Sequence, residues 1–194
     1  MLGGILAAAS LLLLAPNAYA QVESGSWKTW SPGYNVQQVG CGSVSGSTFK
    51  LTCSSSSGEQ RAERRYDTYS GGTHQFEGYF KINSMGGSRI SLKQTFRDGS
   101  GAGPFFLLAV EKGGRLYAVH GGETIATGAT VGTSVRVNTI NQVGSTHKVY
   151  INGSLKNTMS SPSGSYYDKL GAYRTASGQG PISVTWSNIK FWTK

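Results

Sequence analysis

"HQFEGYFKI", residues 74–82, alternates between polar and core-compatible side chains from Gln75 onward. Successive side chains of a β-strand point to opposite faces, so this alternation gives one face suited to a core and one suited to water. The expected core face carries Phe76, Gly78, Phe80 and Ile82. The opposite face carries Gln75, Glu77, Tyr79 and Lys81. The stretch therefore predicts a strand of an antiparallel sheet with one buried face.

Runs of the same kind recur at short spacing through the rest of the chain. The residues expected to share a face are Ile90, Leu92, Gln94 and Phe96 in RISLKQTF (89–96), and Ile182, Val184, Trp186 and Asn188 in ISVTWSNIKFW (182–192). The chain has 28 glycines and no helical stripe of apolar residues. Short strands separated by turn signals predict an all-β fold, a single-domain antiparallel β-sandwich of the jelly-roll type. We expect one of its sheets to curve into a concave groove that holds a linear polymer.

The first twenty residues, MLGGILAAASLLLLAPNAYA, have the features of a secretory signal peptide: an apolar stretch followed by Ala-Tyr-Ala, a small-x-small cleavage site. The positively charged start of such peptides is missing. A membrane anchor is the alternative, but the apolar run is short for a membrane span. We therefore expect a secreted, extracellular protein whose mature part, residues 21–194, is one domain of a size that can bury a proper core.

The charge balance favours an anionic partner. The chain has 18 Lys and Arg against nine Asp and Glu, a formal net charge of +9. Such an excess attracts anions but says nothing about fold. For an exported protein we expect the partner to be an acidic polysaccharide rather than nucleic acid or a membrane. We also expect a monomer that needs no cofactor.

Cys41 and Cys53 are the only cysteines. In an oxidising compartment such a pair predicts a disulfide, which would contribute about 3 kcal/mol by the chain-entropy estimate. Two buried free thiols are the alternative. We expect no metal site, because two cysteines and three scattered histidines offer too few ligands. Asn152-Gly153-Ser154 is both a glycosylation sequon and an Asn-Gly turn signal, and the sequence does not decide whether Asn152 is glycosylated.

Two segments carry the chemistry. In QRAERRY (60–66) a strand would place Arg61, Glu63 and Arg65 on one face. In YYDKLGAYRT (166–175) it would place Tyr167, Lys169, Gly171 and Tyr173 on one face. These are poor core residues and good ligands for an anion, since Arg can grip a carboxylate with two hydrogen bonds. A solvated, salt-bridged strand face is the alternative reading for Arg61, Glu63 and Arg65.

Arginine, glutamine and tyrosine on neighbouring strands suit β-elimination on a uronic acid. The reaction removes the proton next to the sugar carboxylate and expels the glycosidic oxygen. Donors such as Arg61 and Gln94 would stabilise the anion that develops at the carboxylate. A tyrosine can take the proton, and nearby cations favour its ionised form. A further proton must reach the leaving oxygen.

RAERR (61–65) resembles the R-x-E-x-R segment of family 7 polysaccharide lyases, the concanavalin-like jelly-roll alginate lyases. YDKLGAY (167–173) resembles their Y-x-K-x-G-x-Y segment, and Gln94 falls where they carry Gln-x-His. The order and separation of the segments also match, and family 20 glucuronan lyases share the architecture. The resemblance implies that Arg61 and Gln94 neutralise the uronate carboxylate and that Tyr173 is the catalytic tyrosine. The binding residues it implies are Arg65, Glu63, Lys169 and Tyr167.

One position departs from that pattern. Two residues after Gln94, where the family has histidine, this chain has Phe96, which cannot remove a proton. In mannuronate and glucuronate the C5 proton and the leaving oxygen lie on the same side of the ring, so one tyrosine could serve as base and then acid. The loss therefore favours those polymers, or else it marks a protein that only binds. His74 and His120 could replace the missing histidine, although a surface or structural role is the simpler reading of each.

The sequence thus predicts a secreted polysaccharide lyase that cleaves a polyuronate, either alginate (polymannuronate) or glucuronan. The alternative is a carbohydrate-binding, lectin-like protein on the same scaffold, which Phe96 favours and the Tyr167–Tyr173 segment disfavours. A glycoside hydrolase would need two well-placed carboxylates, and no clustered pair is present. Which polyuronate is cleaved, whether from its ends or internally, and whether calcium is bound are not decided by the sequence.

Overall fold

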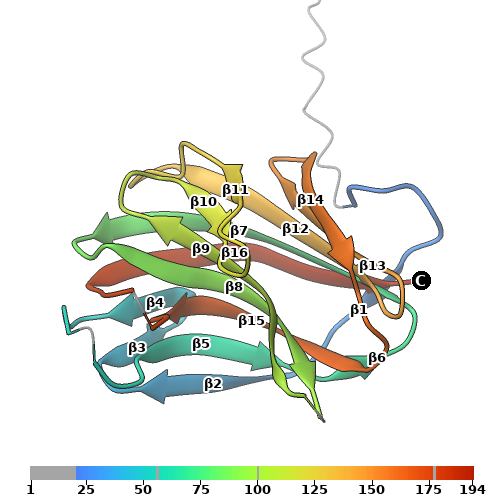
Figure 1. Ribbon diagram of the computed structural model, residues 1–194, viewed down its shortest axis with the longest axis horizontal. Coiled ribbons are helices and arrows are strands. Elements are labelled where there is room, and N and C mark those ends of the chain that lie inside the picture. The colour runs from blue at the N-terminus through green and yellow to red at the C-terminus, as the bar shows by residue number, and fades with distance from the viewer. Residues whose placement is uncertain (1–20, 56, 100, 177) are drawn as a thin grey trace, which may run out of the picture.

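The computed structural model describes residues 21–55, 57–99, 101–176 and 178–194. These residues form strands and loops, with no helix among them, and the strands make two eight-stranded antiparallel sheets that pack as a sandwich (Figure 1). The all-β prediction is therefore confirmed. The expected signal peptide, residues 1–20, lies outside the described residues. Within those residues, no helix is long and apolar enough to cross a membrane.

Sheet A has the strand order β14-β13-β12-β7-β16-β4-β3, and β1 pairs with β16. Its strands are β1 (Lys28–Trp30), β3 (Gly42–Ser45), β4 (Thr48–Leu51), β7 (Thr73–Met85), β12 (Ser134–Gln142), β13 (Thr146–Ile151), β14 (Ser154–Ser160) and β16 (Ile182–Thr193).

Sheet B has the order β11-β10-β9-β8-β15-β5-β2, and β6 pairs with β15. Its strands are β2 (Tyr34–Val39), β5 (Arg61–Tyr66), β6 (Tyr69–Ser70), β8 (Arg89–Asp98), β9 (Gly103–Glu111), β10 (Leu116–Ala118), β11 (Thr124–Ala126) and β15 (Ser165–Tyr173). In Figure 1, β9, β8, β15, β5 and β2 follow one another from the upper to the lower part of the molecule.

The core lies between the two sheets, and Phe76, Phe80 and Ile82 face it as expected. On the opposite face of β7, Gln75 and Glu77 are buried as well, so that face is not simply a solvent face. Phe80 and Trp186 are fully buried, and their rings lie 5.5 Å apart across neighbouring strands β7 and β16. Gly78 leaves room for this aromatic layer, because a Cβ there would lie 2.7 Å from the Phe76 ring and 3.0 Å from the Trp186 ring. Burial of such apolar surface is the main stabilising contribution in a sandwich of this size.

Strand β8 departs from strict alternation. Its pairing with β9 shifts register between Ser91 and Lys93, which is a β-bulge. Ile90 and Leu92 face the core as expected, but beyond the bulge the parity changes. Lys93 pairs with the core residue Leu170, whereas Gln94 pairs with Lys169 on the opposite, outward face of sheet B. The expectation that Gln94 and Phe96 share a face with Ile90 and Leu92 is therefore wrong.

A second irregularity occurs in β16. Ile182, Val184 and Trp186 are buried as expected, but the pairing with β7 shifts register between Ser187 and Lys190, and Asn188 has a φ of 51° and is exposed. Asn188 therefore does not continue the core face.

Two local predictions are confirmed. Cys41 and Cys53 form a disulfide with a Cα–Cα distance of 5.9 Å, which ties β3 to the end of β4. Asn152 and Gly153, with φ values of 51° and 82°, make the tight turn between β13 and β14. Positive φ at both positions is the signature of the turn that Asn-Gly favours.

Candidate functional site

The predicted site residues come from three neighbouring strands of sheet B. In the register of β5 with β15, Arg61 lies opposite Tyr173 and Arg65 lies opposite Lys169. In the register of β15 with β8, Lys169 lies opposite Gln94. Directly opposed residues of an antiparallel pair point to the same face. The strands β5, β15 and β8 therefore bring these side chains together on the outward face of sheet B.

Glu63 is the hub of this face. It is 1% exposed, and its Oε1 accepts a hydrogen bond of 2.5 Å from Gln94 Nε2. Arg61 Nε lies 3.3 Å from Glu63 Oε2, an ion-pair distance, while Arg61 Nη1 donates to Gln37 Oε1 at 3.1 Å. Burial raises the pKa of Glu63, although Lys169, Arg61 and Gln94 act in the opposite direction. The carboxylate thus contacts both the amide of Gln94 and the guanidinium of Arg61.

Cations lie over the aromatic rings of the same face. The Arg61 guanidinium carbon is 4.9 Å from the centroid of the Tyr173 ring, and the Arg65 guanidinium carbon is 4.0 Å from that of Tyr167. The Phe96 ring stacks on the Tyr167 ring at 4.8 Å and 11°. Burial raises the pKa of the Tyr167 phenol, with Arg65 opposing it. Tyr167 is therefore held in a stack between Phe96 and Arg65, whereas Tyr173 contacts Arg61 alone among these cations.

Lys169 is nearly buried within this group. Its side chain is 3% exposed, and Nζ lies 5.2 Å from the Phe96 centroid and 5.7 Å from the Tyr167 centroid. Burial lowers its pKa to about 8; Glu63 acts in the opposite direction and Arg61 adds to the lowering. Among the described residues, Nζ has no hydrogen-bond or ion-pair partner.

Gly171 is required where β15 passes Glu63. Its φ is 141°, and a Cβ there would lie 2.2 Å from the carbonyl oxygen of Ala62 and 2.8 Å from the Cα of Glu63. The register of β15 with β8 shifts between Leu170 and Tyr173, so this glycine lies in a bulge. The bulge sets the direction in which Tyr173 leaves the strand.

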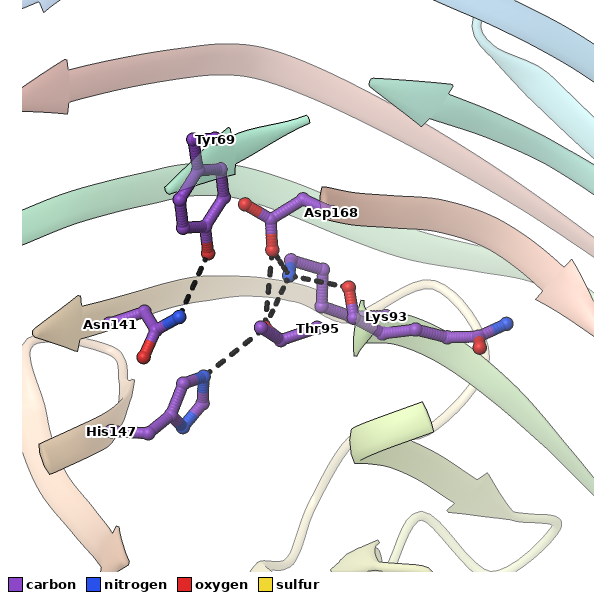
Figure 2. Close-up of polar contacts among 7 residues, drawn as sticks. Tyr69, Lys93, Thr95, Asn141, His147 and Asp168 are labelled. Atoms are coloured by element: carbon purple, nitrogen blue, oxygen red, sulfur yellow. Dashed lines mark hydrogen bonds and ion pairs between the residues drawn. The ribbon is translucent and has the colours of Figure 1, made fainter. Parts of the chain in front are cut away.

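The inward face of the same strands carries a separate polar cluster (Figure 2). Lys93 and Asp168 form an ion pair, and Thr95 Oγ1 donates to Asp168 Oδ1 at 3.2 Å. Lys93 Nζ also donates to the carbonyl oxygen of Gln94 at 2.9 Å. His147 Nε2 lies 3.1 Å from Thr95 Oγ1. Burial lowers the pKa of His147 to about 3 and also lowers the pKa of Lys93.

In the part of the chain that the structure describes, no histidine contacts the outward-face residues in place of the histidine that Phe96 replaces. His74 stacks on Tyr69 at 3.9 Å, and its Nε2 lies 3.0 Å from the Gly71 carbonyl oxygen. His120 is exposed beyond β10, where it borders a cavity with Glu123. The sequence did not predict that His147 is fully buried and contacts Thr95 in the inward cluster. Sequence reasoning missed it because Thr146-His147-Lys148 has no feature that separates it from a surface strand.

A cavity of about 630 Å³ lies at the edge of the sandwich rather than over the predicted site. Trp30, Tyr34, Arg64 and Lys190 are among its lining residues, and none of Arg61, Gln94 and Tyr173 is. The candidate site is instead the outward face of β5, β15 and β8. The concave groove expected there stays a prediction.

Comparison with known proteins gives the same fold. No protein-family model and no curated protein matches the chain. Solved structures do match: an alginate lyase of polysaccharide lyase family 7 at 23% identity and a TM-score of 0.55, covering 75% of this chain and 74% of that one. The alginate lyase from Corynebacterium sp. matches at 20% identity and a TM-score of 0.62, covering 76% and 78%.

A third match is the family 7 alginate lyase A1-II' in complex with a GGMG substrate, at 17% identity and a TM-score of 0.56, covering 76% of this chain and 77% of that one. This chain has the jelly-roll fold of the family 7 alginate lyases. The resemblance read from its short motifs is therefore confirmed at the level of the fold. Because a shared fold does not by itself establish an activity, the function must be argued from the site.

Proposed function

We propose that this chain is a polysaccharide lyase that cleaves an acidic polyuronate by β-elimination. The observation that carries the proposal is the convergence of Arg61, Gln94 and Tyr173 on the outward face of sheet B, from three adjacent strands. The structural neighbours are alginate lyases, and one of them was solved with a GGMG substrate. The +9 net charge fits an anionic polymer.

Arg61 and Gln94 supply the electrophilic part of the site. Elimination begins by removing the C5 proton next to the sugar carboxylate, and negative charge then develops on that carboxylate. Hydrogen-bond donors that are held in place before the reaction stabilise this charge without reorganising. Glu63 holds both donors through its contacts with Gln94 Nε2 and Arg61 Nε. In the complex, the substrate carboxylate would accept from the donor hydrogens that Glu63 does not use.

Tyr173 supplies the base. Its ring lies 4.9 Å from the guanidinium carbon of Arg61, so its hydroxyl belongs to the same face as a group proposed to hold the substrate carboxylate, next to the C5 proton. One structural neighbour was solved with its GGMG substrate after a histidine was replaced by asparagine and a tyrosine by phenylalanine. In this chain Phe96 occupies the position expected for a histidine and is stacked on Tyr167.

The proposed substrate class follows from the presence of phenylalanine instead of histidine at position 96. A phenyl ring cannot exchange a proton, so a reaction that needs an imidazole on the far side of the sugar is disfavoured. Polymannuronate and polyglucuronate present the C5 proton and the leaving oxygen on one side of the ring. We therefore propose these polymers as substrates and, given the expected signal peptide, a secreted enzyme.

Phe96 also favours a second candidate, a carbohydrate-binding protein on the same scaffold, and one experiment separates the two. The protein is incubated with polymannuronate, polyguluronate and polyglucuronate in the presence of a metal chelator, while ultraviolet absorbance and polymer binding are followed. A lyase produces an unsaturated sugar end and a rising absorbance, with mannuronate or glucuronate polymers fastest. Binding without any rise would establish the carbohydrate-binding alternative, and saturated products would indicate a hydrolase.

A further inference from the structure

We propose that the ammonium group of Lys169 is a catalytic residue that donates the proton to the leaving glycosidic oxygen. This inference rests on the proposed lyase function and deepens it by naming the second proton carrier of the reaction. The sequence assigned Lys169 only a role in substrate binding.

The elimination needs two proton transfers. Tyr173 as phenolate takes the C5 proton, the electrons of that C–H bond form the C4–C5 double bond, and the C4–O4 bond breaks. The departing oxygen is a poor leaving group unless it receives a proton, which Lys169 Nζ supplies. The products are the unsaturated sugar, the new hydroxyl end, a neutral amine and a neutral phenol. Return of the phenolic proton to the amine through solvent restores the starting state, so no co-reactant is consumed.

Lys169 is a cation of this face that has no partner among the residues the structure describes. Its side chain is 3% exposed, and no described residue accepts a hydrogen bond from Nζ or forms an ion pair with it. A buried charged group without a partner is costly, so proteins pair such groups or use them to bind ligands. By contrast, Arg61 and Arg65 on the same face have carboxylates within ion-pair distance, at Glu59 and Asp98 respectively. The free donor hydrogens of Lys169 are therefore available to a substrate oxygen.

The other groups on this face are unsuited to the second transfer. Guanidinium groups stay protonated at any working pH, which excludes Arg61 and Arg65 as proton carriers. Glu63 is 1% exposed and is engaged by Gln94 and Arg61. Tyr167 is stacked between Phe96 and Arg65, and Phe96 has no exchangeable proton. Lys169 remains as the second titratable group of this face with a free donor.

The acidity of Lys169 suits the task. Burial lowers its pKa to about 8, which keeps the ammonium form dominant at neutral pH while making it a stronger acid than an exposed lysine. The charged groups around it act in both directions: Glu63 and Glu59 raise the pKa, whereas Arg61 and Arg65 lower it. The phenols of Tyr167 and Tyr173 lie on the same strand face.

The position of Lys169 also fits. It is directly opposite Gln94, which is proposed to hold the substrate carboxylate. Its Nζ lies 5.2 Å from the ring centroid of Phe96, where the family pattern has the imidazole. The amine therefore lies beside the carboxylate-binding residue and on the same strand face as Tyr173, as an elimination with both transfers on one side of the sugar ring requires.

The test compares Lys169→Met with the matched control Lys156→Met, which changes an exposed lysine on β14 of the other sheet. On the polyuronate that the wild-type protein cleaves, we expect Lys169→Met to lower kcat by about 10²–10⁴-fold, the usual contribution of a general acid. On a synthetic uronide with nitrophenolate at C4, a leaving group that needs no proton, we expect the variant to act within about threefold of wild type. Lys156→Met should match wild type on both substrates.

The pH profile gives a second, independent readout. The wild-type rate on the polymer should fall above a pH of about 8, as Lys169 loses its proton. Lys169→Arg keeps the charge but should lose this basic limb along with most of its activity, because guanidinium does not donate at that pH. Melting curves identify any variant that fails to fold, and Lys169→Arg then serves in place of Lys169→Met.

Equal losses on both substrates, or an unchanged basic limb in Lys169→Arg, would overturn the proposal and leave Lys169 as a binding residue. Full activity of Lys169→Met on the polymer would overturn it as well. Failure of the lyase function itself looks different, because the wild-type protein would then form no unsaturated product from any polyuronate or from the nitrophenolate substrate.

Discussion

The two faces of strands β8 and β15 each bury a lysine, and the two lysines are treated in opposite ways. Lys93 on the inward face is 0% exposed and has Asp168, Thr95 and the Gln94 carbonyl oxygen as partners. Lys169 on the outward face is 3% exposed and has no such partner among the described residues. Both have a pKa lowered by burial. The two adjacent strands therefore carry one lysine whose ammonium group is hydrogen-bonded and one whose ammonium group has no acceptor among the described residues.

The difference between the two lysines indicates that the inward and outward faces have different roles. A paired and hydrogen-bonded charge between two sheets contributes to a unique packing, and disrupting it is costly. An unpaired charge on a ligand-facing surface lowers stability unless a ligand supplies the partner. We infer that the inward cluster maintains the sandwich and that the outward face performs the chemistry. Changes on the inward face should affect unfolding, and changes on the outward face should affect catalysis.

Asp168→Ala gives the largest expected effect on stability. It would leave the Lys93 ammonium buried without its carboxylate, so we expect the free energy of unfolding to fall by about 3–5 kcal/mol. Chemical denaturation measures this loss. The double variant Lys93→Met/Asp168→Leu removes both charges and should recover much of the loss. If Asp168→Ala lowers the free energy of unfolding by less than about 1 kcal/mol, the inward cluster does not stabilise the sandwich.

Acid should weaken the inward cluster through His147. Its pKa is lowered to about 3 in the folded protein against about 6.5 when unfolded, so between these values the unfolded chain binds more protons. Stability is therefore present above pH 6.5 and is lost as the pH falls. We expect about 2 kcal/mol less stability at pH 5 than at pH 7 from this group, with His74 acting in the same direction.

Denaturation at the two pH values, for wild type and His147→Gln, measures the contribution. The pH-dependent difference should shrink in the variant by most of that amount. An identical pH dependence in both proteins would show that His147 is exposed to protons in the folded state.

Arg65→Ala should give the smallest effect, and on binding rather than on stability. Arg65 is about one-third exposed and covers the Tyr167 ring at 4.0 Å. We expect KM for the polyuronate to rise about tenfold, with kcat changed little, because the charge attracts the substrate before and during the reaction alike. The unfolding free energy should change by less than about 1 kcal/mol. A loss confined to kcat would place Arg65 in the chemical step instead.

Most of the fold was predictable because alternation and turn chemistry are local. Residues 74–82 alternate through the core of sheet A, and Asn152-Gly153 makes the predicted turn. The bulge at Leu92 was not predictable, since Ser91-Leu92-Lys93 has no glycine or proline to mark it. Gly171 is such a mark on β15, where an isolated glycine in a strand pattern indicates a bulge.

The membership of the candidate site was predictable, and its arrangement was not. Arg61, Glu63 and Arg65 share a face by simple alternation, as do Tyr167, Lys169 and Tyr173. That Gln94 joins them depends on the bulge in β8, which reverses the direction expected from Ile90 and Leu92. The inward pairing of Lys93 with Asp168 follows from the same change of parity, because strict alternation would have turned Lys93 outward.

The most direct test of the account is the rate of unsaturated-product formation by Tyr173→Phe, measured beside wild type on the polyuronate that wild type cleaves fastest. No described residue hydrogen-bonds the Tyr173 hydroxyl, so the variant should unfold at the wild-type temperature and still bind the polymer. We expect its rate to fall by about 10²–10⁴-fold. A Tyr173→Phe protein that forms product at the wild-type rate would contradict the assignment of proton transfer to the outward face.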